Sequence, residues 1–142
     1  MKISDLMTER IVSVDKDEPV VAAARLLKKH NVGALPVTDR EKRLRGIVTD
    51  RDIVLRCVAG ELDPGATPVG EIMTRGIVTA EGADLVDDAV RAMSRDQVRR
   101  LPVVENGRLI GMLSLCDLSR SPGCAMEAAE ALTEISLNLR RK

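Results

Sequence analysis

The sequence has no aromatic side chain, because its 142 residues include no Phe, Tyr or Trp. Aromatic rings are the platforms on which single-strand nucleic-acid binders stack bases, so their absence argues against that class of protein. Val, Ile, Leu, Met and Ala must therefore fill the core. A planar ring bound by this chain would have to lie between aliphatic side chains.

The chain also lacks net charge, since 22 Lys and Arg balance 22 Asp and Glu. With no global field to draw it to nucleic acid or a membrane surface, any anion site must be built locally. No apolar run approaches the roughly 20 residues of a membrane span. The first residues lead into a charged segment and not into the apolar core of a signal peptide. These features predict a cytoplasmic protein with no nucleic-acid or membrane partner.

Cysteine and histidine are scarce in this sequence. Cys57, Cys116 and Cys124 are widely spaced and odd in number, and His30 is the single histidine. This spacing supports neither a disulfide framework nor a metal site. A lone histidine with no paired nucleophile argues against hydrolase or transferase chemistry. We therefore expect no enzymatic activity, no bound metal and no cofactor.

An internal repeat organises the chain. At an offset of 66 residues, Met7-Thr8 falls on Met73-Thr74 and Leu35-Pro36-Val37 falls on Leu101-Pro102-Val103. After one deletion the offset is 65, and Gly46 and Asp52 then match Gly111 and Asp117. Matches that keep their order along the chain indicate two copies of one unit of about 50 to 60 residues.

The repeats are predicted to occupy residues 1–60 and 71–120, with a Pro- and Gly-containing linker over 61–70. A third segment, residues 124–140, is predicted to be an amphipathic helix. We expect it to pack on the repeats or on a neighbouring subunit. The spacing suggests that its apolar face consists of Met126, Ala129, Leu132, Ile135 and Leu139.

Each repeat is predicted to run strand, helix, strand, strand, helix. In the first copy these elements are expected at 11–14, 20–29, 35–38, 44–49 and 53–59. In the second they are expected at 77–80, 85–94, 101–105 and 109–114 and from Leu115 onward, after a short helix over 69–73. Since one unit cannot cover both faces of its sheet, an α+β fold with two repeats packed face to face about a pseudo-twofold axis is expected.

The predicted helix faces bear on assembly. Val20, Ala23, Ala24 and Leu27 lie on one face of the first helix, and Leu85, Ala89 and Met93 on one face of its counterpart. This is more apolar surface than one pair of repeats is expected to bury against itself. The sequence thus predicts a symmetric homodimer.

The segments Gly46–Ile53 and Gly111–Leu118 each end a buried strand and begin a helix, with a hydroxyl residue three positions before a carboxylate. One interpretation is a capping box, in which Thr49 and Asp52 only start the helix. The other is a ligand site, because free amides and the helix dipole favour phosphate. A carboxylate can also accept bonds from both hydroxyls of a ribose.

Together the tandem repeat, the Met-Thr segments, the Leu-Pro-Val strands and the two Gly-x-x-[Ser/Thr]-x-x-Asp motifs resemble a CBS-domain pair, or Bateman module. The resemblance covers about residues 1 to 120. The Asp-Arg-Asp-Ile-Val helix start further resembles small stand-alone bacterial pairs of the hypoxic-response type. The resemblance implies a regulatory protein that binds adenosine derivatives (AMP, ADP, ATP or S-adenosylmethionine) in clefts between the repeats, often as a dimer.

Carried onto matching positions, the resemblance implies that Asp52 and Asp117 take the ribose hydroxyls and that Thr49 and Ser114 meet phosphate. Arg51 stands where family members place a phosphate contact, whereas the second copy has Cys116 there. Before the Leu-Pro-Val strands the first copy has Gly33-Ala34 and the second has Arg99-Arg100, so the two clefts are expected to differ. The adenine would lie among Ile11, Val12, Val32, Gly33, Ala34, Pro36, Ile77, Val78, Val98, Arg99, Arg100 and Pro102.

Two other functions stay open. One is a scaffold protein whose clefts have lost their ligand and whose helix faces bind a regulated protein partner. The other is a metal- or redox-responsive stress protein that uses His30 and the cysteines, with Cys116 as the thiol inside a motif.

Overall fold

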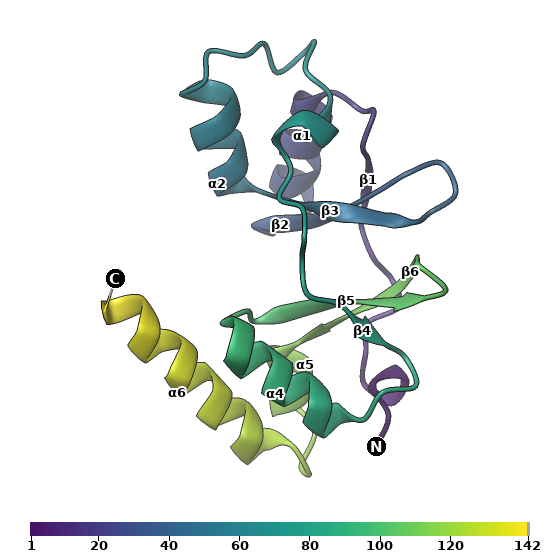
Figure 1. Cartoon of the computed structure of the whole chain (residues 1–142), viewed down its shortest axis with the longest axis vertical. Helices are drawn as coiled ribbons and strands as arrows, with labels where there is room; N and C mark the ends of the chain where they lie inside the picture. The colour runs from purple at the N-terminus through teal and green to yellow at the C-terminus, as the bar shows by residue number, and fades with distance from the viewer. Residues whose placement is uncertain (142) are drawn as a thin grey trace. The chain divides into compact units, whose positions relative to one another are not determined.

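The computed structural model describes the backbone of residues 1–141 and the side chains of residues 1–137, and the chain forms two compact units (Figure 1). Unit 1 contains Met1–Ile11, Val78–Asn106 and the chain from Ile110 onward. Unit 2 contains Val12–Ile77 and Gly107–Leu109. The first eleven residues thus belong with the second repeat, so the compact units do not follow the order of the sequence. None of the described helices is long and apolar enough to cross a membrane.

Unit 2 is built on a three-stranded sheet in the order β1-β2-β3, formed by β1 (Val14–Asp15), β2 (Ala34–Thr38) and β3 (Leu44–Thr49). Strand β1 runs parallel to β2, and β2 pairs antiparallel with β3, which confirms the predicted hairpin. The helical segments are α1 (Val20–His30), α2 (Asp50–Asp52), η2 (Ile53–Val58) and α3 (Val69–Ile72). Segment η2 has π-helical bonding, in which the Ala59 N–H donates to the Val54 carbonyl at 2.9 Å.

The apolar stripe of α1 covers the sheet of its own unit. Val20, Ala23 and Leu27 are buried in one core with Leu35 and Val48. In unit 1, Ala89 and Met93 are likewise buried, whereas Leu85 is 54% exposed. The prediction that these helix faces stay open for a second subunit was therefore wrong, because each helix packs its apolar stripe onto its own sheet.

Unit 1 repeats the arrangement with a sheet in the order β4-β5-β6, formed by β4 (Ala80–Glu81), β5 (Arg100–Glu105) and β6 (Arg108–Ser114). Its helical segments are η1 (Ile3–Asp5), α4 (Val86–Asp96), α5 (Leu115–Ser119) and α6 (Ala125–Arg141). The N-terminal segment is held by backbone bonds from Ile3 to Asp84 (2.9 Å) and from Ser4 to Gly82 (3.0 Å). Ile3 is fully buried in the core of this unit.

Two predicted strands are much shorter than expected. Only Val14 of residues 11–14 and only Ala80 of residues 77–80 lie in strands. The residues before them carry the chain from one unit to the other, at Ile11–Val12 and at Ile77–Val78. A connecting segment of this kind has no neighbouring strand with which to form a ladder.

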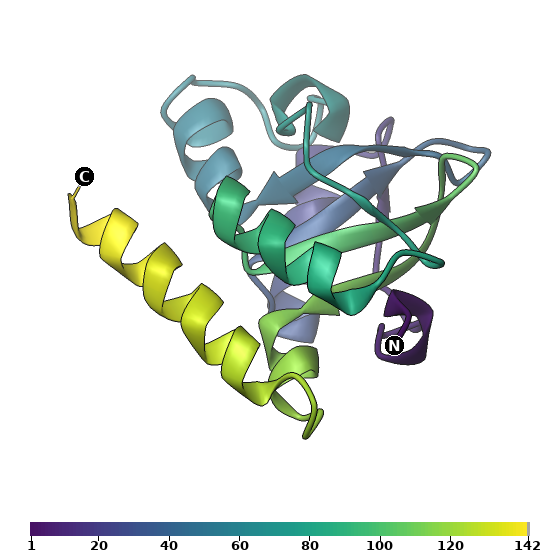
Figure 2. The ribbon, with the colours of Figure 1, turned by 60° about the horizontal axis from the view of Figure 1, so that its bottom comes forward.

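Helix α6 packs along α4 and α5 within unit 1 (Figures 1 and 2). The predicted helix is confirmed, but its buried face is Ala128, Ala131 and Ile135, and of the predicted face only Ile135 is buried. Met126 is 73% exposed and Leu132 is 44% exposed, while the side chain of Leu139 lies outside the described residues. Small alanines let the helices approach closely, so the inward face is not the one with the largest side chains.

Candidate functional site

The motif of unit 2 forms a complete capping box at the junction of β3 and α2. The Asp52 N–H donates to Thr49 Oγ1 at 3.0 Å, and the Thr49 N–H donates to Asp52 Oδ2 at 3.0 Å. This confirms the structural interpretation of the motif. It does not exclude a ligand, because a carboxylate has about four lone-pair positions and the cap uses one of them.

A third residue, Thr74, completes this arrangement. Its hydroxyl lies 3.1 Å from Asp52 Oδ1 and 3.2 Å from Oδ2, and its backbone exchanges two hydrogen bonds with Ile47 of β3, at 2.8 and 3.0 Å. The chain can cross β3 here because of Gly46, where an added Cβ would lie 2.5 Å from the Thr74 carbonyl oxygen. The glycine of the motif thus makes room for the Met-Thr segment, whose threonine reaches the motif's carboxylate.

Unit 1 contains the same arrangement. The Asp117 N–H donates to Ser114 Oγ at 3.1 Å, and the Ser114 N–H donates to Asp117 Oδ2 at 2.9 Å. Thr8 takes the place of Thr74, with its hydroxyl 3.4 Å from Asp117 Oδ1. Its backbone exchanges bonds of 2.8 and 3.0 Å with Met112 of β6. The Met-Thr motif was the sequence signal for Thr8 and Thr74, but no local pattern indicated that they reach the aspartates.

The two carboxylates differ in their surroundings. Asp52 is only 7% exposed, and Arg56 Nη1 lies 3.8 Å from its Oδ1. The same Arg56 nitrogen donates to the carbonyls of Ile72 and Met73, at 3.1 and 2.9 Å. Asp117 is half-buried, and among the described side chains no cation lies within ion-pair distance of it. Asp117 therefore has more unused acceptor capacity.

The first-turn amides of the two helices also differ. In unit 2 the Asp50 N–H donates to the Gly33 carbonyl at 3.0 Å, and the Arg51 N–H donates to Asp50 Oδ1 at 2.8 Å. Because the Asp52 N–H also donates to Thr49, none of the three amides in this first turn is free to bind a phosphate. In unit 1 the Leu115 N–H donates to the Arg99 carbonyl at 3.0 Å. Leu115 stands in the place of Asp50 and brings no carboxylate to the junction.

The residues predicted to enclose the adenine are distributed over both units. In unit 2, Ala34 pairs across the sheet with Thr49, and buried Pro36 pairs with Ile47, which places both near the capping box. Val98 and Val78 pack against the core of unit 1, while Val12 packs against that of unit 2. Ile11 belongs to unit 1 and is followed by Val12 of unit 2, whereas Ile77 belongs to unit 2 and is followed by Val78 of unit 1. Val32 is 37% exposed, and Pro102 is buried.

Only the motif of unit 1 has neighbouring arginines whose charge is not opposed by an ion pair or by an adjacent carboxylate of the described residues. Arg99 and Arg100 are exposed, and the described residues contain no ion pair or hydrogen bond made by their guanidinium groups. Arg51 is exposed as well, but it lies between the carboxylates of Asp50 and Asp52 along the chain. The site of unit 1 is therefore the more positive of the two.

No group of three or more His, Cys, Asp or Glu side chains that could hold a metal ion occurs among the described residues. Cys57 and Cys124 are buried in different units, whereas Cys116 and His30 are exposed. The described Cys, His, Asp and Glu side chains thus do not gather in the set of three or four protein ligands that a zinc site uses.

The duplicated geometry has a counterpart in known families. A family model for the CBS domain matches residues 3–58 and again residues 69–122. The chain belongs to the CBS-domain family. It is 40% identical over 134 residues to the CBS domain-containing protein YhcV of Bacillus subtilis, covering 94% of each chain. It is also 34% identical over 116 residues to Hypoxic response protein 1 of Mycobacterium tuberculosis, covering 82% of this chain and 81% of the relative.

Solved structures of CBS proteins share the fold. The crystal structure of Hypoxic Response Protein I with two coordinated zinc ions matches with a TM-score of 0.78 at 33% identity, over 84% of this chain and 98% of that one. The CBS domain protein PAE2072 from Pyrobaculum aerophilum, complexed with AMP, matches with a TM-score of 0.75 at 32% identity, over 92% of this chain and 99% of that one. The predicted α+β fold and family are thus confirmed.

Proposed function

We propose that this CBS pair is a regulatory protein without catalytic activity that binds an adenine nucleotide, and that unit 1 provides the stronger site. The observation that carries the proposal is the duplicated arrangement of hydroxyl, aspartate and Met-Thr threonine at the start of a helix. A relative of 32% identity was solved in complex with AMP, which supports the ligand class.

In unit 1, Asp117 is the proposed acceptor for the ribose hydroxyls. Its Oδ1 receives only the long 3.4 Å bond from Thr8, and its side chain is partly accessible. A ribose hydroxyl that approaches Oδ1 can make a shorter, charge-assisted bond than the threonine makes. Asp52, which already accepts from Thr49 and Thr74 and is nearly buried, has less to offer.

Phosphate binding in unit 1 is assigned to Arg99 and Arg100. Helix α5 spans only Leu115–Ser119, so its dipole contributes little, on the order of 0.3 to 1 kcal/mol at an exposed helix end. A guanidinium can instead bind two phosphate oxygens at once. The Arg99 carbonyl accepts the first amide of α5, which keeps the start of β5 beside the capping box.

Isothermal titration calorimetry with AMP and with adenosine tests the proposal. Wild type should prefer AMP, and the double variant Arg99→Ala/Arg100→Ala should lose that preference while it keeps its affinity for adenosine. Asp117→Ala should raise the dissociation constant for both ligands about tenfold to hundredfold, as expected for a lost charged hydrogen bond. Asp52→Ala is the matched variant in unit 2 and should change the affinity less.

Two results would contradict the proposal. One is the absence of measurable heat with AMP, ADP, ATP and S-adenosylmethionine. The other is a double variant that still prefers AMP over adenosine by the margin of the wild type. Raising the salt concentration from 50 to about 200 mM should also weaken AMP binding, because exposed charges are screened.

The predicted homodimer also remains a proposal. We place its interface on a surface different from the helix faces named in the sequence analysis. On the helical segment of unit 2, Val54, Leu55 and Val58 are 54, 49 and 65% exposed. Neighbouring exposed aliphatic side chains of this kind favour an interface. Light scattering at micromolar concentration should show a dimer, and Val54→Asp/Val58→Asp should shift it toward monomer.

A further inference from the structure

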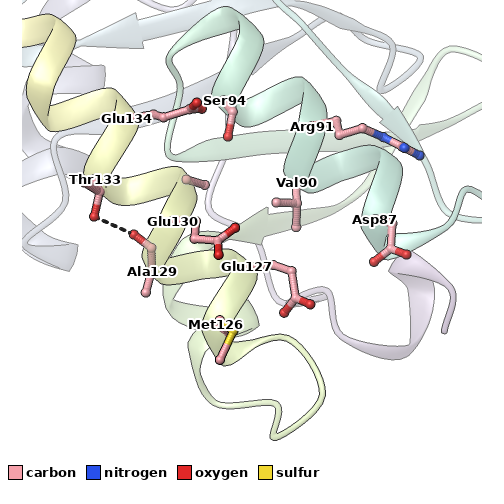
Figure 3. A pocket seen from close by; sticks show the side chains of 11 residues that line it. Asp87, Val90, Arg91, Ser94, Met126, Glu127, Ala129, Glu130, Thr133 and Glu134 are labelled. Atoms are coloured by element: carbon pink, nitrogen blue, oxygen red, sulfur yellow. Dashed lines mark hydrogen bonds between the residues drawn. The ribbon is translucent and has the colours of Figure 1, made fainter.

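A groove of about 860 Å³ lies between α4 and α6 of unit 1 (Figure 3). It runs along the side of α6 and belongs to neither capping box. The residues that line it come from one face of each helix: Asp87, Val90, Arg91, Ser94, Met126, Glu127, Ala129, Glu130, Ala131, Thr133 and Glu134.

The hollow exists because small side chains lie where the two helices face each other. Ala129 of α6 and Ser94 of α4 are too small to fill the space between the helices on this side. Val90 and Met126 supply apolar walls, and Met126 is 73% exposed. An exposed methionine beside a groove is a flexible apolar contact that can adapt to an incoming side chain.

The rim of the groove is acidic. Glu127, Glu130 and Glu134 follow one another along α6, over a length of about 10 Å at 1.5 Å per residue. Asp87 adds a carboxylate from α4 (Figure 3). Arg91, the basic residue of the lining, is paired with Asp88. No ion pair reaches the four lining carboxylates from any described side chain.

This acidic row does not serve the stability of α6. Like charges three and four residues apart on a helix repel each other and destabilise the helix. Glu127 lies in the first turn, where the helix dipole favours a negative charge. Glu130 and Glu134 lie beyond the first turn and have no such compensation.

We propose that this groove docks a basic amphipathic helix of another protein. The apolar stripe of such a helix would contact Val90, Met126 and Ala129, and its Lys or Arg side chains would reach the carboxylates of α6. Helix-in-groove recognition uses this combination of apolar anchors and flanking charges.

In a second copy of this chain, neither α1 nor η2 presents the apolar stripe and flanking basic residues that the groove would bind. The apolar stripe of α1 is buried in its own core, and the basic residues of α1 are Arg25 and, in its last turn, Lys28, Lys29 and His30. Within η2 the one basic residue is Arg56, which binds the carbonyls of Ile72 and Met73. A separate partner therefore fits the surface better than self-association does.

The test uses the full chain and a fluorescein-labelled synthetic peptide of about 16 residues, long enough to form a helix. The peptide contains only Leu and Lys, with Leu at helical spacing. A second peptide has the same composition with Leu at alternate positions, and a third replaces Lys with Glu. Fluorescence anisotropy measures the affinity of each, and methyl NMR of Val90, Met126 and Ala129 locates the bound peptide.

Three variants distinguish binding in the groove from non-specific attraction between opposite charges. Glu130→Lys/Glu134→Lys reverses the rim, while Glu81→Lys/Glu105→Lys changes the net charge equally at exposed positions of β4 and β5 outside the groove. Ala129→Phe fills the groove with no change in charge. Thermal unfolding checks each variant, and Glu130→Gln/Glu134→Gln replaces the reversed pair if that pair does not fold.

Only the helical Leu/Lys peptide is expected to bind. Its affinity should fall at least tenfold in the rim variant and in Ala129→Phe, and it should change less than twofold in the control variant Glu81→Lys/Glu105→Lys. The proposal is overturned if no peptide binds, if the control weakens binding as much as the rim variant, or if the methyl signals move elsewhere. A dimer that only the rim variant dissociates would also overturn it, since the occupant would then be a second copy.

Discussion

Unit 2 surrounds its aspartate, whereas unit 1 leaves its aspartate accessible. Both carboxylates complete a capping box and both receive a threonine hydroxyl, but Asp52 is 7% exposed and has Arg56 at 3.8 Å, while Asp117 is half-buried. The Thr74 hydroxyl approaches Asp52 to 3.1 Å, and the Thr8 hydroxyl approaches Asp117 to 3.4 Å. These differences support the proposal that the duplicated motif serves mainly stability in unit 2 and ligand binding in unit 1.

The largest expected difference between the units concerns the glycines of the motifs. At Gly46 an added Cβ would lie 2.5 Å from the Thr74 carbonyl oxygen, which the sheet holds in place. At Gly111 it would lie 2.5 Å from the sulfur of Met7, a flexible side chain that can move aside. Gly46→Ala should thus lower the free energy of unfolding by about 3 kcal/mol and Gly111→Ala by about 1 kcal/mol.

Urea unfolding of both glycine variants measures this difference. Gly123→Ala is the control, because no atom lies within 4 Å of the added Cβ, and it should be close to neutral. Equal losses at Gly46 and Gly111 would mean that the two Met-Thr crossings are equally rigid.

The next largest difference concerns the aspartates themselves. Asp52→Ala removes the cap and leaves Thr74 and Arg56 without their carboxylate, so it should cost about 2 to 3 kcal/mol of stability. Asp117→Ala removes a cap and one long bond and should cost about 1 kcal/mol. Denaturant unfolding gives both values in the absence of ligand. If Asp117→Ala is the more destabilising, the assignment of a structural role to unit 2 and a binding role to unit 1 is wrong.

The smallest expected difference concerns the two hairpin turns. After β2, Asp39 accepts from the N–H groups of Glu41 and Arg43, at 2.9 and 3.0 Å, and from Arg45 Nε at 2.9 Å. Partial burial raises the pKa of Asp39, but the bonds from Arg43, Glu41 and Arg45 outweigh it and hold the pKa below its ordinary value of 3.8. In the other hairpin, Asn106 and Gly107 have φ angles of 54° and 80°, which need no charged group.

A lowered folded-state pKa means that the stabilisation by Asp39 is complete above the unfolded-state pKa and is lost as the pH falls through the folded-state value. Asp39→Asn should therefore destabilise the protein at pH 7, and the difference from wild type should shrink below about pH 4. Asn106→Ala should cost about 1 kcal/mol with no such pH dependence, because its penalty comes from the left-handed backbone. Thermal unfolding from pH 7 to about pH 2.5 checks both.

Local patterns in the sequence determined a large part of this fold. The repeat offset, the helix over α1 and the hairpins β2–β3 and β5–β6 follow from apolar periodicity and turn residues within short windows. The capping boxes could be predicted from the sequence because Thr49 and Ser114 lie only three residues from their aspartates. The CBS family follows from several such motifs in the same order, twice over.

Tertiary structure alone decided the rest, because it depends on contacts between residues far apart in the chain. Thr8 and Asp117 are separated by 109 positions, and no local pattern indicates that they meet. The same holds for the N-terminal segment, which packs with the second repeat, and for the buried face of α6, which small alanines form against α4 and α5. Arg56 follows Asp52 by only four residues and is a local neighbour that the sequence already places there. Which aspartate is buried, in contrast, depends on what packs around it, since both aspartates lie in the same motif and only the fold covers one of them.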